Sequence, residues 1–316
     1  MKILVTPTSF TQTGGEAALE LLRSFSDNLV FNPLGRPLTG DELVPLLAGC
    51  EGFIAGVDFI TRNVIENSPG LKVISRYGVG VDRVDIAAAN GKGIIVCNTP
   101  GVNAHAVADL TFGLLLSIAR KISLLDRKTR NGEWPRSTGF ELYGKTIGIL
   151  GLGAVGKAVA KRAAGFSMKI MAHDIAIDRE FVEAHNIIDA TFGHIVRSAD
   201  VLTLHLPLTD ETRNLISRDI MAVMKKGAVI INTARGGLID ETAACEFLKS
   251  GHLGGLGLDV FEAEPPPSSP LFTLDNVTVT PHTGAHTAEA ISGMAELSVK
   301  NLIDVLSGRD CPYIVR

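Results

Sequence analysis

Residues 146–156, TIGILGLGAVG, decide the fold of this chain. Residues 146–150 are a short apolar run that predicts a strand, and residues 157–166 follow with the periodicity of an amphipathic helix. At the turn between them, the first glycine allows a sharp bend, the second lets a pyrophosphate approach the backbone, and the third lets helix and strand pack closely. The pattern predicts dinucleotide binding at the helix N-terminus. We expect cofactor contacts at Gly151, Gly153, Ala154, Val155 and Gly156.

The residue that ends the next predicted strand, Asp174 after residues 169–173, indicates which dinucleotide is bound. A carboxylate there can accept both hydroxyls of an adenosine ribose and would repel a 2′-phosphate. Ile175 and Ala176 offer that phosphate no cation. The sequence therefore predicts NAD rather than NADP.

The composition is that of a globular protein and argues against several other classes. The chain has 316 residues, of which 46% are hydrophobic and 20% charged, and this length allows two domains. A net charge of −4 gives no electrostatic basis for nucleic-acid binding. No apolar run reaches membrane-spanning length, and residues 1–6 lack the layout of a signal peptide. We expect a cytoplasmic protein with neither a nucleic-acid nor a membrane partner.

The four cysteines have the spacing of neither a metal site nor a disulfide framework. Three of them lie among apolar or small residues, and we expect these to be reduced packing residues. No metal is therefore expected. The four positions are Cys50, Cys97, Cys245 and Cys311.

Strands and helices alternate along almost the whole chain, which predicts an α/β protein with two doubly wound parallel sheets. The first half has five expected strands, at residues 2–6, 29–31, 52–55, 71–75 and 94–97. The second half has six expected strands, at residues 146–150, 169–173, 201–204, 229–232, 255–258 and 277–280.

Two long helical patterns lie outside these sets and suggest the domain organisation. Residues 104–121 lead into a polar arm, residues 130–139, whose Trp134 is either a dimer contact or packed on its own domain. Residues 289–306, with no strand expected after them, would return to close the first domain. We expect a discontinuous substrate domain and an NAD-binding domain with a cleft between them. Their expected bounds are 1–99 with 286–316, and 100–285, the latter including a dimerisation helix and arm at about 103–140.

Three charged residues follow neighbouring strands of the second half: Arg235, Glu264 and His282. In open α/β sheets, ligands bind at the carboxyl ends of strands, where these side chains would meet. Hydride exchange between NAD and a carbinol needs a base for the hydroxyl proton, and histidine suits this near neutral pH. A carboxylate can stabilise the imidazolium, and a guanidinium can polarise the carbonyl and hold a carboxylate.

Over nearly its whole length, the chain resembles the D-isomer-specific 2-hydroxyacid dehydrogenases, most closely the phosphoglycerate-dehydrogenase-like members. The motifs that carry the resemblance are YGVGVDRVD at 77–85, NTPG at 98–101, GKTIGILGLG at 144–153, HLPL at 205–208, the Arg235 loop, DVF at 259–261 with Glu264-Pro265, and PHTG at 281–284. The resemblance implies a flavodoxin-like substrate domain, a Rossmann NAD-binding domain and a homodimer. Related formate dehydrogenases carry glutamine in place of Glu264, which favours 2-oxo acid chemistry here.

The resemblance also implies roles for individual residues. Arg235, Glu264 and His282 would be catalytic, and Asp259 would approach the nicotinamide amide. The backbone N–H groups of Val79 and Gly80 would bind the substrate carboxylate. The remaining expected cofactor contacts are Leu206, Pro207, Thr212, Thr233, Ala234, Arg235, His282 and Gly284.

The substrate itself is left open between two classes of 2-hydroxy acid. Arg76 matches an arginine of phosphoglycerate dehydrogenases and Arg136 lies near another of their basic positions, so both are either ligands of a 3-phosphoglycerate-like substrate or surface arginines. Gly56-Val57-Asp58 stands where those enzymes have Arg-Ser, which favours glyoxylate, hydroxypyruvate or another unphosphorylated acid. Tyr77 is expected to limit the size of the pocket, and the end of the chain at residue 316 suggests that no C-terminal regulatory domain follows. An NAD(H)-sensing, corepressor-like binding protein is the alternative outside enzymes.

Overall fold

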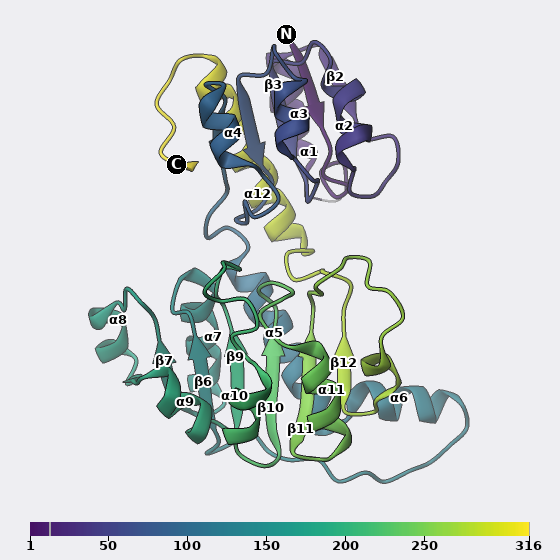
Figure 1. Cartoon of the computed structure of the whole chain (residues 1–316), viewed down its shortest axis with the longest axis vertical. Helices are drawn as coiled ribbons and strands as arrows, with labels where there is room; N and C mark the ends of the chain where they lie inside the picture. Colours follow the sequence, from purple (N-terminus) through teal and green to yellow (C-terminus); the bar gives the residue numbers. More distant parts are fainter. Residues whose placement is uncertain (13, 316) are drawn as a thin grey trace. The chain divides into compact units, whose positions relative to one another are not determined.

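The computed structural model describes residues 1–12 and 14–315 and divides the chain into two compact units (Figure 1). The N-terminal unit consists of Met1–Asn103 and Ala285–Arg316, and the C-terminal unit of Ala104–Gly284. Among the described residues, no helix has both the length and the apolar character needed to cross a membrane.

The N-terminal unit is built on a six-stranded sheet in the order β13-β5-β4-β3-β1-β2. The strands are β1 (Lys2–Val5), β2 (Asn28–Phe31), β3 (Gly52–Ala55), β4 (Val73–Arg76), β5 (Ile95–Cys97) and β13 (Ile314–Val315). The first five are mutually parallel, as the sequence predicts. The expectation that no strand follows the last long helix is wrong, because β13 pairs antiparallel with β5. Its two residues are too few to show any periodicity in the sequence.

Five helices cover this sheet: α1 (Glu16–Phe25), α2 (Gly40–Leu47), α3 (Arg62–Glu66), α4 (Ile86–Gly91) and α12 (Ala288–Leu306). The last of these returns from the far end of the sequence and packs against β3, β4 and α1 (Figure 1). Its residues Ala295, Val299 and Leu302 are buried in one core with Ile3 and Val73. This apolar stripe, spaced at helical intervals, is why the unit is formed from two separate stretches of chain.

The C-terminal unit contains seven parallel strands in the order β12-β11-β10-β9-β6-β7-β8. The strands are β6 (Thr146–Leu150), β7 (Lys169–His173), β8 (Ile188–Asp189), β9 (Val201–Leu204), β10 (Ala228–Asn232), β11 (Leu253–Leu258) and β12 (Val277–Val279). The sequence-based expectation of six strands is wrong by one. The additional strand, β8, is an edge strand of two exposed residues, which have no buried face to produce a pattern.

Helices lie on both faces of this second sheet (Figure 1). They are α5 (Ala104–Arg120), α6 (Ile122–Arg130), α7 (Ala154–Gly165), α8 (Arg179–Ala184), α9 (Phe192–Ser198), α10 (Arg218–Val223), α11 (Glu241–Lys249) and a short 3₁₀ turn, Pro270–Thr273. The buried helix α5 packs against α7 and β11. Lys121, with φ of 54°, is left-handed and separates α5 from α6, so the predicted long helix stops there. Two doubly wound α/β units are thus confirmed.

Candidate active site and cofactor site

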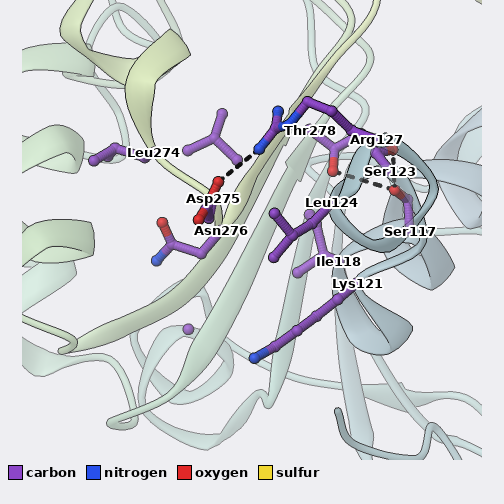
Figure 2. Close-up of a pocket in the computed structure, with 12 residues that line it drawn as sticks. Ser117, Ile118, Lys121, Ser123, Leu124, Arg127, Leu274, Asp275, Asn276 and Thr278 are labelled. Carbon is purple, nitrogen blue, oxygen red and sulfur yellow. Dashed lines mark hydrogen bonds and ion pairs between the residues drawn. The ribbon is translucent and has the colours of Figure 1, made fainter. Parts of the chain in front are cut away.

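One pocket of the C-terminal unit lies at the edge of the sheet where β11 and β12 begin (Figure 2). It measures about 210 Å³ and is lined by the end of α5, the start of α6, Gly254 and residues 274–278. Its polar groups pair with one another: Arg127 Nη2 donates to Asp275 Oδ1 at 2.7 Å, and the Ser117 and Ser123 hydroxyls are 2.7 Å apart. This pocket lies where the strands begin, whereas the candidate catalytic residues follow the ends of their strands. The candidate active site is therefore at the opposite, carboxyl end of the strands.

The glycine-rich turn between β6 and α7 has the geometry that a diphosphate site requires. Gly151 has φ of 91°, and a Cβ there would lie 2.4 Å from the His205 carbonyl oxygen. A Cβ on Gly156 would lie 2.0 Å from the carbonyl oxygen of Gly151, so both positions exclude any side chain. A Cβ on Gly153 would meet nothing within 4 Å, and this N-cap makes no side-chain hydrogen bond to α7. The first turn of α7 therefore offers uncapped N–H groups beside open space, which fits a diphosphate.

Asp174 is joined to this turn by its own hydrogen bonds. Its Oδ2 accepts from the Leu152 N–H at 2.6 Å, and its Oδ1 accepts from the Ala176 N–H at 2.8 Å. The carboxylate at the end of β7 is therefore held next to the glycine turn, where an adenosine ribose would extend from the diphosphate. Ile175 is fully exposed and Ala176 carries no charge. These residues fit the diphosphate and ribose of NAD.

The loop after β9 contains three more of the expected cofactor contacts. The Thr212 hydroxyl donates to the Pro207 carbonyl oxygen at 2.8 Å, and it accepts from the Thr209 N–H at 2.8 Å. Thr212 thus shapes the loop, while Leu206 packs against the hydrophobic core of the unit. His205 Nε2 lies 2.9 Å from the Thr203 hydroxyl, and burial lowers the pKa of this imidazole to about 3. His205 is therefore neutral at physiological pH and is no candidate for proton exchange.

Arg235 is presented by a tight turn after β10. The Asn232 side chain makes this turn, because its Oδ1 accepts from the Ala234 N–H at 3.0 Å and its Nδ2 donates to the Arg235 carbonyl oxygen at 2.7 Å. The Thr233 hydroxyl lies 2.9 Å from that of Thr111 on α5. These contacts fix the backbone of residues 233–235 at the carboxyl edge of the sheet. The signal in the sequence was an asparagine that ends a buried strand, a residue that favours such turns.

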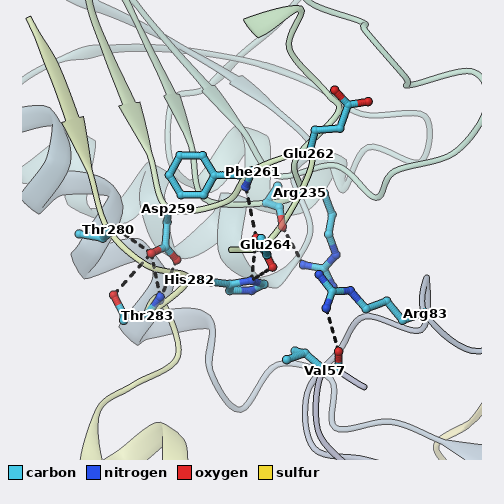
Figure 3. A network of polar contacts seen from close by, with 12 residues as sticks. Val57, Arg83, Arg235, Asp259, Phe261, Glu262, Glu264, Thr280, His282 and Thr283 are labelled. Carbon is cyan, nitrogen blue, oxygen red and sulfur yellow. Dashed lines mark hydrogen bonds and ion pairs between the residues drawn. The ribbon is translucent and has the colours of Figure 1, made fainter. Parts of the chain in front are cut away.

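Glu264 and His282 lie in direct contact (Figure 3). His282 Nδ1 is 2.9 Å from Glu264 Oε2 and 3.1 Å from Oε1, and Oε1 also accepts from the Phe261 N–H at 3.2 Å. The side chain of Glu264 is 15% exposed and that of His282 is 36% exposed. With Nδ1 directed at the carboxylate, Nε2 is the ring nitrogen that can exchange a proton with a ligand.

Asp259 holds the loop that carries His282 (Figure 3). This aspartate is 1% exposed, and its Oδ1 accepts from the Thr280 hydroxyl at 2.6 Å and from the Thr283 N–H at 2.8 Å. Its Oδ2 accepts from the Gly284 N–H at 2.8 Å, and its carbonyl oxygen accepts from the His282 N–H at 2.8 Å.

These contacts matter because His282 has φ of 53°, a left-handed conformation that costs a residue with a Cβ about 1–2 kcal/mol. The aspartate therefore positions the histidine, a role that the sequence does not reveal. A Cβ on Gly284 would lie 3.0 Å from Asp259 Oδ2, so glycine leaves room for the carboxylate.

In the N-terminal unit, the structure assigns Arg76 and Tyr77 to the interior. Arg76 is 5% exposed, and it donates from Nη1 to the Ala55 carbonyl oxygen at 2.7 Å and from Nε to the Gly80 carbonyl oxygen at 3.0 Å. Tyr77 is buried against Phe10, and its hydroxyl accepts from the Ser9 hydroxyl at 3.2 Å. A phosphate-binding Arg76 and a pocket-limiting Tyr77 therefore stay predictions, and the interior position of both side chains favours neither. Both side chains are directed into the unit, where their polar groups meet its own atoms.

Loop 78–80 is held in place by Arg76 and by two residues that follow β5, Asn98 and Thr99. The Thr99 hydroxyl accepts from the Gly78 N–H at 2.9 Å, and Asn98 Nδ2 donates to the Val79 carbonyl oxygen at 2.9 Å. The carbonyl oxygens of Val79 and Gly80 are thus both bound, which fixes the orientation of the peptide groups in this loop. Arg136, the other candidate for phosphate, is an exposed residue of the arm in the C-terminal unit.

Comparison with known proteins gives a consistent result. Residues 112–284 match the family model of the D-isomer specific 2-hydroxyacid dehydrogenase NAD-binding domain. The chain is 48% identical over 259 residues to a D-3-phosphoglycerate dehydrogenase of Methanocaldococcus jannaschii, but it spans only 49% of that protein's length. It is 43% identical over 267 residues to a glyoxylate reductase of Thermococcus litoralis, of which it covers 81%. Among solved structures, the TT0316 protein from Thermus thermophilus is 40% identical, with a TM-score of 0.90 over the full length of both chains.

Proposed function

We propose that the chain, which belongs to the D-isomer specific 2-hydroxyacid dehydrogenase family, uses NADH to reduce a small unphosphorylated 2-oxo acid of the glyoxylate or hydroxypyruvate type. Arg76 is the observation that carries this choice of substrate. Its guanidinium already donates to the carbonyl oxygens of Ala55 and Gly80 inside the N-terminal unit. Releasing it to a phosphate would break both of these hydrogen bonds, which is costly in the interior. The Ala55 carbonyl oxygen would keep only its hydrogen bond from the Tyr77 N–H at 2.9 Å.

In the proposed reaction, bound NADH supplies the hydride and the protein supplies the proton and the binding charges. His282 donates a proton from Nε2 to the C2 oxygen of the substrate, while Glu264 at Nδ1 stabilises the imidazolium beforehand. Arg235 polarises the C2 carbonyl and forks onto the substrate carboxylate. Oxidation of the 2-hydroxy acid uses the same groups in reverse.

The glycine turn and Asp174 are proposed to hold the cofactor. The N–H groups of residues 153–156 bind the diphosphate, and Asp174 accepts the hydroxyls of the adenosine ribose. Residues 233–235, with Leu206, Pro207, Thr212 and Gly284, line the remainder of the dinucleotide. The contacts between Asp259 and loop 280–284 support a positioning role in place of the expected contact with the nicotinamide amide.

A phosphorylated substrate remains the second candidate, because the chain is 48% identical to a D-3-phosphoglycerate dehydrogenase over the matched residues. The two candidates differ in whether a cation is available for the phosphate at C3. Buried Arg76 supports the unphosphorylated class, because its guanidinium is already bound inside the N-terminal unit.

We further propose that the protein forms a homodimer through the arm of residues 130–139. Trp134 is 82% exposed, so it is not packed on its own unit, and Tyr143 and Ile122 are also exposed. Large apolar side chains exposed in the arm and in the segments that flank it in the sequence favour contact with another protein. Measuring the mass in solution of the wild type and of Trp134→Ser tests this, and a monomeric wild type would refute it.

The substrate assignment is tested by comparing glyoxylate, hydroxypyruvate and phosphohydroxypyruvate with NADH, following the loss of NADH absorbance. We expect kcat/KM to be higher for an unphosphorylated acid than for phosphohydroxypyruvate, and the reverse order would reassign the substrate to the phosphorylated class. His282→Ala is the control for the reaction itself. It should lower kcat by roughly 10²–10⁴ while NADH still binds.

A further inference from the structure

Cys97 and Cys311 are far apart in the sequence but meet in the core of the N-terminal unit. Their Sγ atoms are 3.5 Å apart, and the two residues are 0% and 5% exposed. Cys97 ends β5, and Cys311 lies three residues before β13, the short strand that pairs with β5. Cys50 lies in another cluster of the same unit, and Cys245 belongs to the C-terminal unit. The proposed function uses none of these thiols.

The surroundings of the pair hold the two sulfurs toward each other. Asn301 on α12 donates from Nδ2 to the Asn98 carbonyl oxygen at 2.9 Å, and its Oδ1 lies 3.6 Å from the Cys311 sulfur. The Asn98 N–H donates to the Tyr313 carbonyl oxygen at 3.2 Å. These contacts next to the two cysteines therefore hold β5 and the C-terminal segment together. The sulfurs need to approach by only about 1.5 Å to reach the bond length of a disulfide.

We propose that Cys97 and Cys311 form a site of reversible disulfide formation, which takes a two-electron oxidant of the peroxide class and locks the C-terminal strand β13 to β5.

The chemistry needs only the two thiols and the oxidant. The Cys311 thiol loses its proton, and the thiolate attacks one oxygen of hydrogen peroxide. The O–O bond breaks, the leaving hydroxide takes up a proton to become water, and the sulfur becomes a sulfenic acid. The Cys97 sulfur then attacks the Cys311 sulfur and loses its proton, the S–O bond breaks, and a second water leaves. Two thiols and one peroxide thus give one disulfide and two waters. A dithiol reductant reverses the bond by exchange.

Cys311 reacts first for two physical reasons. Burial, together with the neighbouring thiol, raises the pKa of Cys97 far above its usual range, so that thiol stays protonated in the closed structure. Cys311 leads into β13, an edge strand of only two residues that pairs with β5 alone, and a pairing this short opens locally at low cost and lets peroxide enter. The reaction should therefore be slow, limited by opening of the C-terminal segment.

The disulfide would affect more than the chain end. Cys97 directly precedes Asn98 and Thr99, which hold the Val79 carbonyl oxygen and the Gly78 N–H. Locking β13 onto β5 therefore stiffens the support of loop 78–80. A bond between residues 214 positions apart also restricts the unfolded chain strongly, so the oxidised protein should unfold at a higher temperature.

The test uses the full chain, first reduced and then treated with hydrogen peroxide. The protein is denatured, its free thiols are counted by alkylation and intact mass, and its cross-linked peptides are mapped. We expect alkylation to fall from four thiols to two, a mass loss of about 2 Da, and a peptide that joins Cys97 to Cys311. The melting temperature should rise by several degrees and return after treatment with dithiothreitol.

Variants separate this site from other thiol chemistry. Cys97→Ser and Cys311→Ser should each lose the cross-link and the rise in melting temperature, whereas Cys245→Ser, a matched change at another buried cysteine, should keep both. Retention of all four thiols in the wild type would overturn the proposal. Further oxidation without a cross-link, or a disulfide between two molecules, would overturn it as well. These wild-type outcomes do not depend on whether any variant folds.

Discussion

Replacing Asp259 by asparagine should damage catalysis by releasing the loop that carries His282. The carboxylate accepts four hydrogen bonds from that loop: one from the Thr280 hydroxyl at 2.6 Å, one each from the Thr283 and Gly284 N–H groups at 2.8 Å, and a longer one from the Thr283 hydroxyl at 3.4 Å. An amide turns one acceptor into a donor that faces an N–H or O–H group, and a lost hydrogen bond to a charged group costs about 1.5–3 kcal/mol.

That cost is comparable with the roughly 1–2 kcal/mol needed to hold His282 in its left-handed conformation. The loop should therefore leave the catalytic geometry in much of the population. A penalty of about 1.5–3 kcal/mol corresponds to a loss of roughly 10- to 100-fold in kcat/KM. Thr280→Val removes a single donor and leaves the carboxylate in place, so it should fall at or below the lower end of this range.

The assay is steady-state reduction of the best 2-oxo acid, with NADH affinity measured separately by fluorescence. If Asp259 positions His282, kcat falls while the Kd for NADH changes little. If Asp259 instead binds the nicotinamide amide, NADH affinity falls as well. A variant whose kcat/KM stays within about twofold of the wild type would refute the positioning argument, because the expected loss is at least tenfold.

Three other residues can be tested separately. Asp174→Ala should weaken the preference for NADH over NADPH, since the carboxylate that repels a 2′-phosphate is gone; equal kcat/KM for both cofactors in the wild type would contradict this. Arg76→Ala should lower stability and reduce kcat/KM equally for hydroxypyruvate and phosphohydroxypyruvate, whereas a loss confined to the phosphorylated acid would identify Arg76 as a phosphate ligand. Below about pH 6.5, His205 is protonated in the unfolded chain. In the folded chain, where its pKa is about 3, it stays neutral over this range. Stability in urea should therefore fall as the pH drops from about 6.5 toward 3, and His205→Gln should flatten this dependence.

Local pattern was sufficient for most of the fold and for the identity of the cofactor. The glycine turn, its flanking strand and helix, and Asp174 lie within 29 consecutive residues, 146–174, and their spacing alone implies a dinucleotide site. Buried strands such as β10 and the amphipathic helix α12 can also be recognised in the sequence, because the burial of one strand or helix face produces a regular pattern of apolar residues. The edge strands β8 and β13 escaped detection because two residues carry no period.

Tertiary structure decided which way each side chain points, and with that the roles of several residues. In sequence, Arg76 and Tyr77 stand beside a substrate loop and look like ligands, yet both side chains turn into the core of the N-terminal unit. Asp259 and loop 280–284 are more than 20 positions apart, and only the pairing of β11 with β12 brings the carboxylate to the backbone that sets His282. Cys97 and Cys311 meet for the same reason, since α12 and β13 carry the end of the chain back to the first sheet. Such contacts depend on which distant strands pair with each other, and the spacing of residues along the sequence does not show this pairing.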